Sequence, residues 1–92
     1  MRIIEEYNDF QIDLIAVKTA TYLGDFAILL VFNDGKNQLV DFKPFLETSL
    51  HPSIRKYLDE LKFEQFDIID GNLNWNNYDL IFPLEDLYHG KI

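Results

Sequence analysis

Residues 26–42 read FAILLVFNDGKNQLVDF, and this stretch decides the fold. An unbroken apolar run at 26–32 is followed by Asn33-Asp34-Gly35-Lys36 and then by a second strand-like run at 38–42. An Asp-Gly pair between two such runs predicts a β-hairpin with a type I′ turn, because both central residues of that turn need a positive φ. Since the first run is apolar throughout, we expect it to be a central strand that is covered on both faces.

The chain before this hairpin predicts one further strand. Residues 10–21 are rich in β-branched side chains, which favours a strand that Gly24-Asp25 ends. Residues 3–7 are apolar and acidic and stop at the turn signal Asn8-Asp9. Residues 1–10 contain no basic stretch followed by an apolar one, so we expect no signal peptide, and no apolar run approaches the roughly 20 residues that cross a bilayer. We therefore expect a cytoplasmic protein that does not enter the membrane, in agreement with the absence of Cys.

The chain after the hairpin predicts one main helix. Pro44 cannot donate to a strand ladder, so the chain should leave the sheet there. Residues 53–62 have apolar side chains at helical spacing, Pro52 suits the first turn, and Thr48 or Ser49 would cap an earlier start. The apolar stripe consists of Ile54, Tyr57, Leu58 and Leu61, and Lys56 and Glu60 form an exposed pair one turn apart.

The last third of the chain predicts further short strands. Turn signals at Asp70-Gly71-Asn72 and Asn76-Asn77 separate strand-like runs at 68–69, 73–75 and 78–82, and Pro83 precedes a single helical turn at 84–88. The order of elements predicts an α+β domain with a mostly antiparallel sheet of about five strands. One main helix lies between the first hairpin and the C-terminal strands. With 92 residues, the chain fits a single domain over 1–92.

A set of short motifs lies along this order of elements. The motifs are Phe32-x-Asp34-Gly35, Val40-Asp41-Phe42-x-Pro44-x-Leu46, Phe63, Ile69-Asp70, Trp75, Asp79-Leu80 and Pro83-x-x-Leu87-Tyr88. Together they resemble a bacterial family called domain of unknown function 2442. The resemblance covers about residues 14–88 and leaves residues 1–13 as an N-terminal extension. The family usually has Trp-Pro-Asn-Gly where this chain has Trp75-Asn76-Asn77-Tyr78, so we expect a different turn there.

The resemblance implies a small intracellular α+β domain without a characterised activity. Some relatives attach such a domain to a C-terminal helix-turn-helix. Single-domain relatives often sit beside another short protein, in an arrangement similar to toxin–antitoxin pairs.

Charge and motif content exclude several classes of function. The net charge is −8, which argues against direct binding of nucleic acid, since neutralising phosphates needs clustered Lys and Arg. His51 and His89 lie in no ligand-spaced motif, so we expect no metal and no cofactor. Thr48, Ser49 and Ser53 lie near His51 but in no nucleophile elbow, and helix capping explains them better. We therefore expect a protein that is not an enzyme.

Six residues are candidates for binding. Asp59, Glu60 and Asp67 belong to an acidic run that would be either a solvated face or a docking face for a basic protein. Trp75, Asp79 and Tyr88 would either anchor a partner or ligand, or serve the core and the Asn76-Asn77 turn.

These observations predict a protein-interaction module as the function. Its partner would be a small basic protein, as for the acidic member of a two-protein system similar to a toxin–antitoxin pair. A second copy of the chain is the other partner considered, through pairing of exposed edge strands. The alternative is a small-ligand-sensing or regulatory domain, related to those attached to helix-turn-helix proteins.

Overall fold

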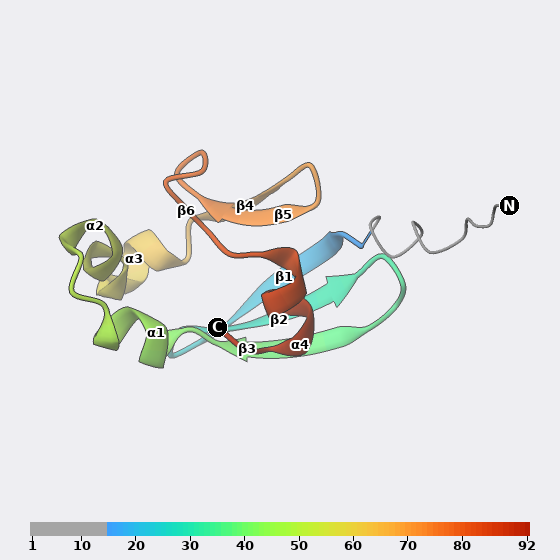
Figure 1. Ribbon diagram of the computed structural model, residues 1–92, viewed down its shortest axis with the longest axis horizontal. Helices are drawn as coiled ribbons and strands as arrows, with labels where there is room; N and C mark the ends of the chain where they lie inside the picture. Colours follow the sequence, from blue (N-terminus) through green and yellow to red (C-terminus); the bar gives the residue numbers. More distant parts are fainter. Residues whose placement is uncertain (1–14) are drawn as a thin grey trace, which may run out of the picture.

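The computed structural model describes residues 15–92, which fold into two three-stranded antiparallel sheets joined by short helices (Figure 1). The α+β class and the antiparallel pairing predicted from the sequence are confirmed, although the strands are divided between two sheets. The segment at 3–7, the first part of the strand predicted at 10–21, and the N-terminal extension lie outside the described residues. The first sheet contains β1 (Val17–Gly24), β2 (Ala27–Phe32) and β3 (Asn37–Asp41), and the second contains β4 (Phe66–Ile69), β5 (Asn72–Trp75) and β6 (Leu80–Ile81).

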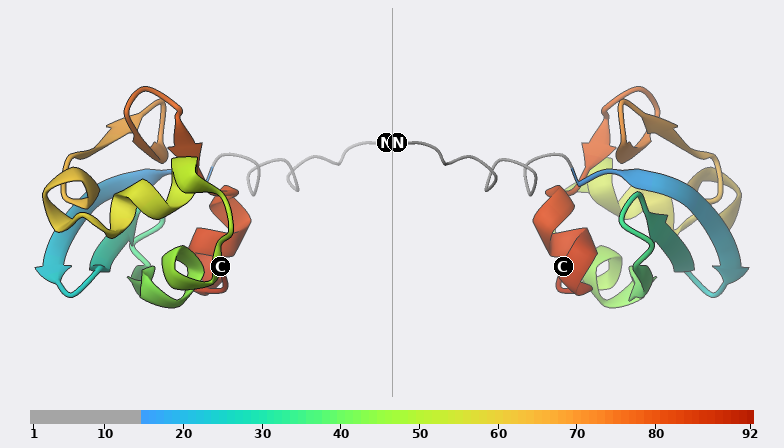
Figure 2. Two further views of the ribbon diagram at one scale, coloured as in Figure 1. Left: turned by 90° about the vertical axis from the view of Figure 1, so that its left-hand side faces the viewer. Right: turned by 90° about the vertical axis from the view of Figure 1, so that its right-hand side faces the viewer.

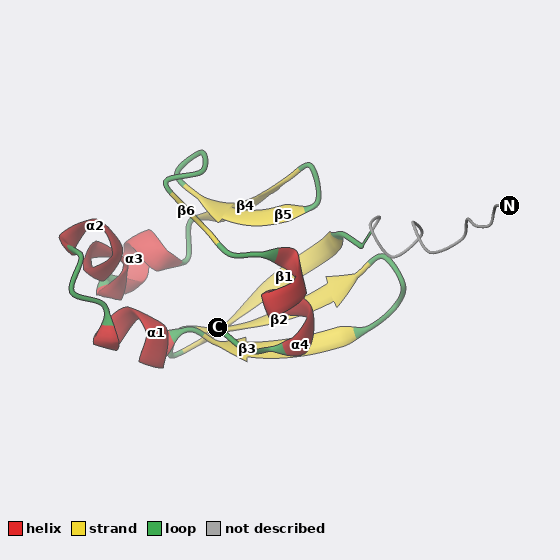
Figure 3. Ribbon diagram, viewed as in Figure 1, coloured by secondary structure: helices red, strands yellow, loops and turns green. Residues whose placement is uncertain are grey.

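Short helical segments link the two sheets and end the chain (Figure 3). They are α1 (Lys43–Thr48), α2 (Pro52–Arg55), the 3-10 helix η2 (Lys56–Leu58), α3 (Glu60–Phe63) and α4 (Leu84–His89). Pro52 begins α2 as predicted, and α4 contains the helical turn predicted at 84–88. Thr48 caps no helix start, because it is the last residue of α1 and its hydroxyl donates to the Pro44 carbonyl at 2.8 Å.

The continuous helix predicted at 53–62 is wrong, because the chain is extended at Asp59. This residue has ψ 110°, and its carboxylate accepts a hydrogen bond from the backbone N–H of Leu61 at 3.1 Å. It is therefore the N-cap of α3 and separates α3 from η2. The interruption turns Leu61 out of the apolar stripe, and its side chain is 69% exposed.

The two Asp-Gly hairpins have different turns. In the first, only Gly35 has a positive φ, and its N–H donates to the Phe32 carbonyl at 2.9 Å. The predicted type I′ turn is therefore wrong at this position, and the loop instead ends in one left-handed glycine. In the second hairpin, Asp70 and Gly71 both have a positive φ, 52° and 79°, as a two-residue type I′ turn requires.

One aromatic core joins the sheets and the helices. Trp75 and Phe63 are fully buried with ring centroids 5.4 Å apart, and Phe42 packs against both of them. The β4–β5 hairpin lies over the start of β1 (Figure 2), where the Val17 N–H donates to the Gly71 carbonyl at 2.8 Å. The central strand β2 supplies the fully buried side chains of Ile28, Leu30 and Phe32 to this core.

Candidate functional site

A buried tyrosine, a lysine and an aspartate meet between the helices and the second sheet. The Tyr57 hydroxyl donates to Asp79 Oδ2 at 2.7 Å, and Lys56 Nζ lies 2.7 Å from the same oxygen. Tyr57 is only 3% exposed, and its ring packs edge-on against Trp75. The cluster therefore connects η2 to the residue that precedes β6. The pair of Lys56 with Glu60 predicted from the sequence does not form, because Lys56 pairs with Asp79 instead.

These contacts shift the pKa values of two groups in opposite directions. The hydrogen bond from Lys56, followed by that from Tyr57, lowers the pKa of Asp79. Burial, together with the hydrogen bond to the Asp79 carboxylate, raises the pKa of Tyr57 to about 12. At neutral pH the cluster thus contains an ionised Asp79 carboxylate and a neutral Tyr57 phenol.

The turn before β6 is built from three consecutive residues in the left-handed region. Asn76, Asn77 and Tyr78 have φ values of 51°, 55° and 73°. The Asp79 N–H donates to the Trp75 carbonyl at 3.0 Å and so closes the turn. Residues other than glycine are strained in this backbone conformation, by roughly 1–2 kcal/mol per residue and by less for Asn. The strand predicted at 78–82 is accordingly shorter and begins at Leu80.

A pocket of about 450 Å³ opens beside this turn and the cluster. Lys56, Tyr57 and Lys62 line it from the helical side. The remaining lining residues are Gln65, Asp67, Asn76 and Asn77, so polar side chains dominate the wall.

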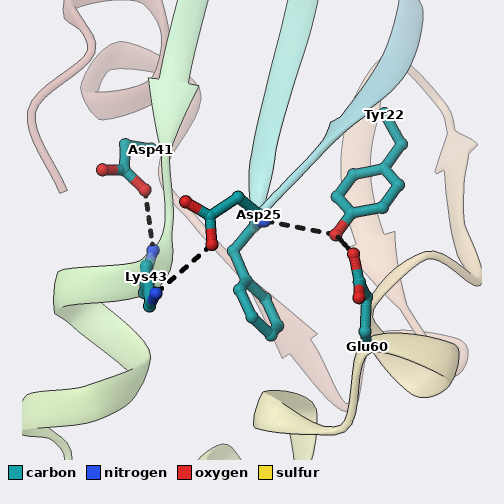
Figure 4. A network of polar contacts seen from close by, with 6 residues as sticks. Tyr22, Asp25, Asp41, Lys43 and Glu60 are labelled. Carbon is teal, nitrogen blue, oxygen red and sulfur yellow. Dashed lines mark hydrogen bonds and ion pairs between the residues drawn. The ribbon is translucent and has the colours of Figure 1, made fainter.

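The three acidic residues predicted for docking have three different surroundings. Asp59 caps α3, as described above, and Asp67 lines the pocket from β4. Glu60 accepts a hydrogen bond from the Tyr22 hydroxyl on β1, and Figure 4 shows these two side chains pointing toward each other.

The same close-up shows the end of the first sheet. Lys43 Nζ lies 3.2 Å from Asp25 Oδ1, and the Lys43 backbone N–H donates to Asp41 Oδ1 at 3.1 Å (Figure 4). The ion pair with Asp25 raises the pKa of Lys43. Two acidic side chains therefore flank this end of the sheet, with one lysine between them.

The structure places Trp75 and Tyr88 in different environments. Trp75 is fully buried, and its Nε1–H donates to the Phe63 carbonyl at 2.7 Å, so it has the core position weighed in the sequence analysis. Tyr88 lies in α4 and donates its hydroxyl to Asp34 Oδ2 at 2.6 Å, while Lys36 Nζ lies 4.0 Å from the centre of its ring. Asp79 does not cap the Asn76-Asn77 turn with its side chain, which points to η2 instead.

The outer face of the first sheet carries a small, partly exposed apolar group among polar side chains. Thr21, Leu29 and Leu39 are aligned across the three strands, and Val31 occupies the next row. Leu39 is 55% exposed, and Leu29 and Val31 are half-buried. We expected β2 to be covered on both faces, but the alternation of its burial places only one face in the core.

The remaining candidates show no chemical assembly within the described part of the chain. The His51 N–H donates to Ser49 Oγ at 3.2 Å, and His89 is the last residue of α4. Across residues 15–92, no group of three or more His, Cys, Asp or Glu side chains is placed to hold a metal ion. None of the helices described in the structure is long and apolar enough to span a bilayer.

Comparison with known proteins gives the class of this α+β domain. The model of a family described as protein of unknown function (DUF2442) matches residues 17–92. The chain belongs to this family, and the resemblance predicted from its motifs is confirmed. Searches of curated proteins and of solved structures found no match.

The pocket and the exposed sheet face are not predicted by the sequence pattern. Lys56, Tyr57 and Lys62 were interpreted only as helix residues, and their proximity to the turn depends on the break at Asp59. The Asn76-Asn77 pair was the available signal, since Asn tolerates a positive φ better than most residues.

Proposed function

We propose that this domain is a protein-interaction module and that the outer face of β1, β2 and β3 is its docking surface. We call this surface the outer sheet face and define it by Thr21, Leu29, Val31 and Leu39. The observation that carries the proposal is the 55% exposure of Leu39 on the edge strand β3, where it lies directly beside Leu29 of β2. A contiguous exposed apolar patch on a small domain is typical of an interaction site.

The charge of the chain supports a basic partner. With a net charge of −8, two copies of the domain would repel each other, whereas a basic protein would be attracted. Asp25 and Asp41 flank one end of the outer sheet face and supply local acidic contacts (Figure 4). The proposed partner is therefore a protein with an apolar surface surrounded by Lys and Arg.

We further propose that the domain is the acidic, non-enzymatic member of a two-protein system similar to a toxin–antitoxin pair, acting in the cytoplasm. The charge of the chain and its family resemblance support this proposal, together with the lack of a motif for nucleophilic or metal-dependent catalysis in the sequence.

The test compares two exposed leucines. Leu39→Asp places a charge on the outer sheet face, whereas Leu50→Asp changes a leucine that is 92% exposed in the loop between α1 and α2. The tagged wild-type domain first captures proteins from the native cells, and these proteins are identified and purified. Each one is then titrated against the wild type, Leu39→Asp and Leu50→Asp. We expect a basic protein to bind with 1:1 stoichiometry and Leu39→Asp to weaken its binding at least about tenfold, as for a central interface residue.

The control separates the outer sheet face from exposed leucines in general. Leu50→Asp should bind like the wild type. Equal binding by all three chains would contradict the proposal. So would a wild-type homodimer in light scattering that Leu39→Asp dissociates, because the occupant would then be a second copy.

A further inference from the structure

The pocket between α3, β4 and the left-handed turn contains two opposite charges that do not pair with each other. Lys62 and Asp67 both line it. The ion pairs within residues 15–92 are those of Lys43 with Asp25 and of Lys56 with Asp79, so neither pocket charge belongs to one. The third lining charge, Lys56, is already neutralised by Asp79 at 2.7 Å. The pocket thus presents one unpaired cation and one unpaired anion.

The rest of the lining adds hydrogen-bonding groups and one fixed side chain. The side chains of Gln65, Asn76 and Asn77 offer amide donors and acceptors. Tyr57, which also lines the pocket, is fixed by its hydrogen bond to Asp79 and by its contact with Trp75. A side chain that is already fixed, as Tyr57 is, loses less conformational entropy on binding than a mobile one.

The strained turn is a second observation at the same place. Three consecutive non-glycine residues in the left-handed region, one of them a tyrosine at φ 73°, persist only where the surrounding structure enforces them. Such strain concentrates at binding sites and active sites. Here the strained conformation includes Asn76 and Asn77, which both line the pocket.

We propose that this pocket binds a small zwitterion of the α-amino acid class. The ligand carboxylate would contact the Lys62 ammonium, its amino group would contact the Asp67 carboxylate, and the Asn and Gln amides would bind its polar atoms. A volume of about 450 Å³ lies within the range of small-molecule sites and accommodates such a ligand. This pocket is distinct from the outer sheet face, so the inference is independent of the proposed interaction with a protein.

The charge pattern favours a zwitterion over simpler ligands. A plain anion would meet the Asp67 carboxylate in a chain that already carries a net charge of −8, and a plain cation would meet Lys62. A ligand with both charges matches both side chains.

The experiment is an NMR titration of the isotope-labelled full chain with each of the 20 standard α-amino acids. For at least one of them we expect saturable shifts of the backbone amides at Lys62, Asn76 and Asn77. The matching α-keto acid, without an amino group, and the matching amine, without a carboxylate, should each bind at least about tenfold more weakly.

Three variants locate the binding. Lys62→Gln should weaken binding of the amino acid at least about tenfold, whereas Lys18→Gln, which changes an exposed lysine of β1 outside the pocket, should leave it unchanged. Asp67→Asn should remove the preference for the amino acid over the α-keto acid. Unchanged amide spectra before and after these substitutions, away from the substituted residue, show that the fold is retained.

Several results would overturn the proposal. Two concern the wild type alone: no amino acid among the 20 gives saturable shifts, or the shifts lie outside the pocket. The others are equal binding by the wild type and Lys62→Gln, and α-keto acids that bind the wild type as tightly as the amino acids do.

Discussion

The hydroxyl of Tyr57 and the carboxylate of Asp79 form a 2.7 Å hydrogen bond that ties the helical half of the domain to its second sheet. Asp79 follows directly after the three left-handed residues of the turn, and the Tyr57 ring packs edge-on against Trp75, the residue that precedes them. This bond therefore holds the strained turn against the core. It also fixes one wall of the pocket.

Tyr57→Phe should destabilise the domain by about 1 kcal/mol. The substitution removes the hydroxyl and leaves Asp79 with Lys56 as its remaining side-chain partner, and losing a hydrogen bond to a charged group costs roughly 1–3 kcal/mol. Urea unfolding at pH 7 measures the change. Tyr78→Phe is the matched control, because Tyr78 is 44% exposed and its substitution should change the free energy of unfolding by less than about 0.5 kcal/mol. Equal effects of the two substitutions would contradict this role.

Tyr57 should ionise about two pH units above an ordinary tyrosine. Its pKa is raised to about 12 from 10, so the folded state holds this proton more tightly than the unfolded state. The stability from this group is complete below pH 10 and is lost as the pH rises toward 12. NMR titration of the tyrosine side chains measures the pKa directly. Asp79→Asn should lower the pKa of Tyr57 toward 10, because it removes the charge but keeps an acceptor. Titration of Tyr57 near 10 in the wild type would refute the assignment.

The local sequence pattern predicts most of the hairpins and turns, because these elements depend on contacts between residues that are near neighbours in the chain. The hairpin of β2 and β3 and the turn at Asp70-Gly71 follow from apolar runs and turn residues. The prediction of one helix at 53–62 was wrong for a local reason as well. Asp59 acts as an N-cap, which competes with continuation of the helix, but the helical spacing of the apolar residues around it gives no sign of this break.

The candidate site could not be predicted in the same way, because it depends on contacts between distant segments. Tyr57 and Asp79 are 22 positions apart, and their meeting requires both the break in the helix and the left-handed turn. For Trp75 the sequence allows either a core role or a binding role. Only its full burial in the structure assigns it to the core. The exposure of Leu39 depends on which face of the sheet the core covers, which an apolar run alone does not specify.

Tyr88→Phe should raise the pKa of Asp34. The Tyr88 hydroxyl donates to this carboxylate at 2.6 Å and is the main cause that lowers its pKa, followed by the backbone N–H of Lys36. Stability from a lowered carboxyl pKa is present above the ordinary value near 3.8 and is lost as the pH falls through the lowered one. The difference in stability between wild type and Tyr88→Phe should therefore shrink from pH 6 to pH 2. Carboxyl NMR titration measures the pKa of Asp34, and an unchanged value in the variant would contradict the contact.

Gly71→Ala should destabilise the domain more than Gly35→Ala, although both glycines have a positive φ. An added Cβ at Gly71 would lie 2.5 Å from the Cβ of Ala16, whereas one at Gly35 would meet nothing within 4 Å. Both variants therefore share a conformational cost of about 1 kcal/mol, and only Gly71→Ala adds a steric clash of roughly 1–3 kcal/mol. The clash falls where the Val17 N–H donates to the Gly71 carbonyl, so relieving it should separate β1 from the β4–β5 turn. Urea unfolding of the two variants measures the difference, and amide hydrogen exchange at Val17 should accelerate only in Gly71→Ala. Equal unfolding free energies with unchanged exchange at Val17 would show that the two sheets do not depend on this close approach.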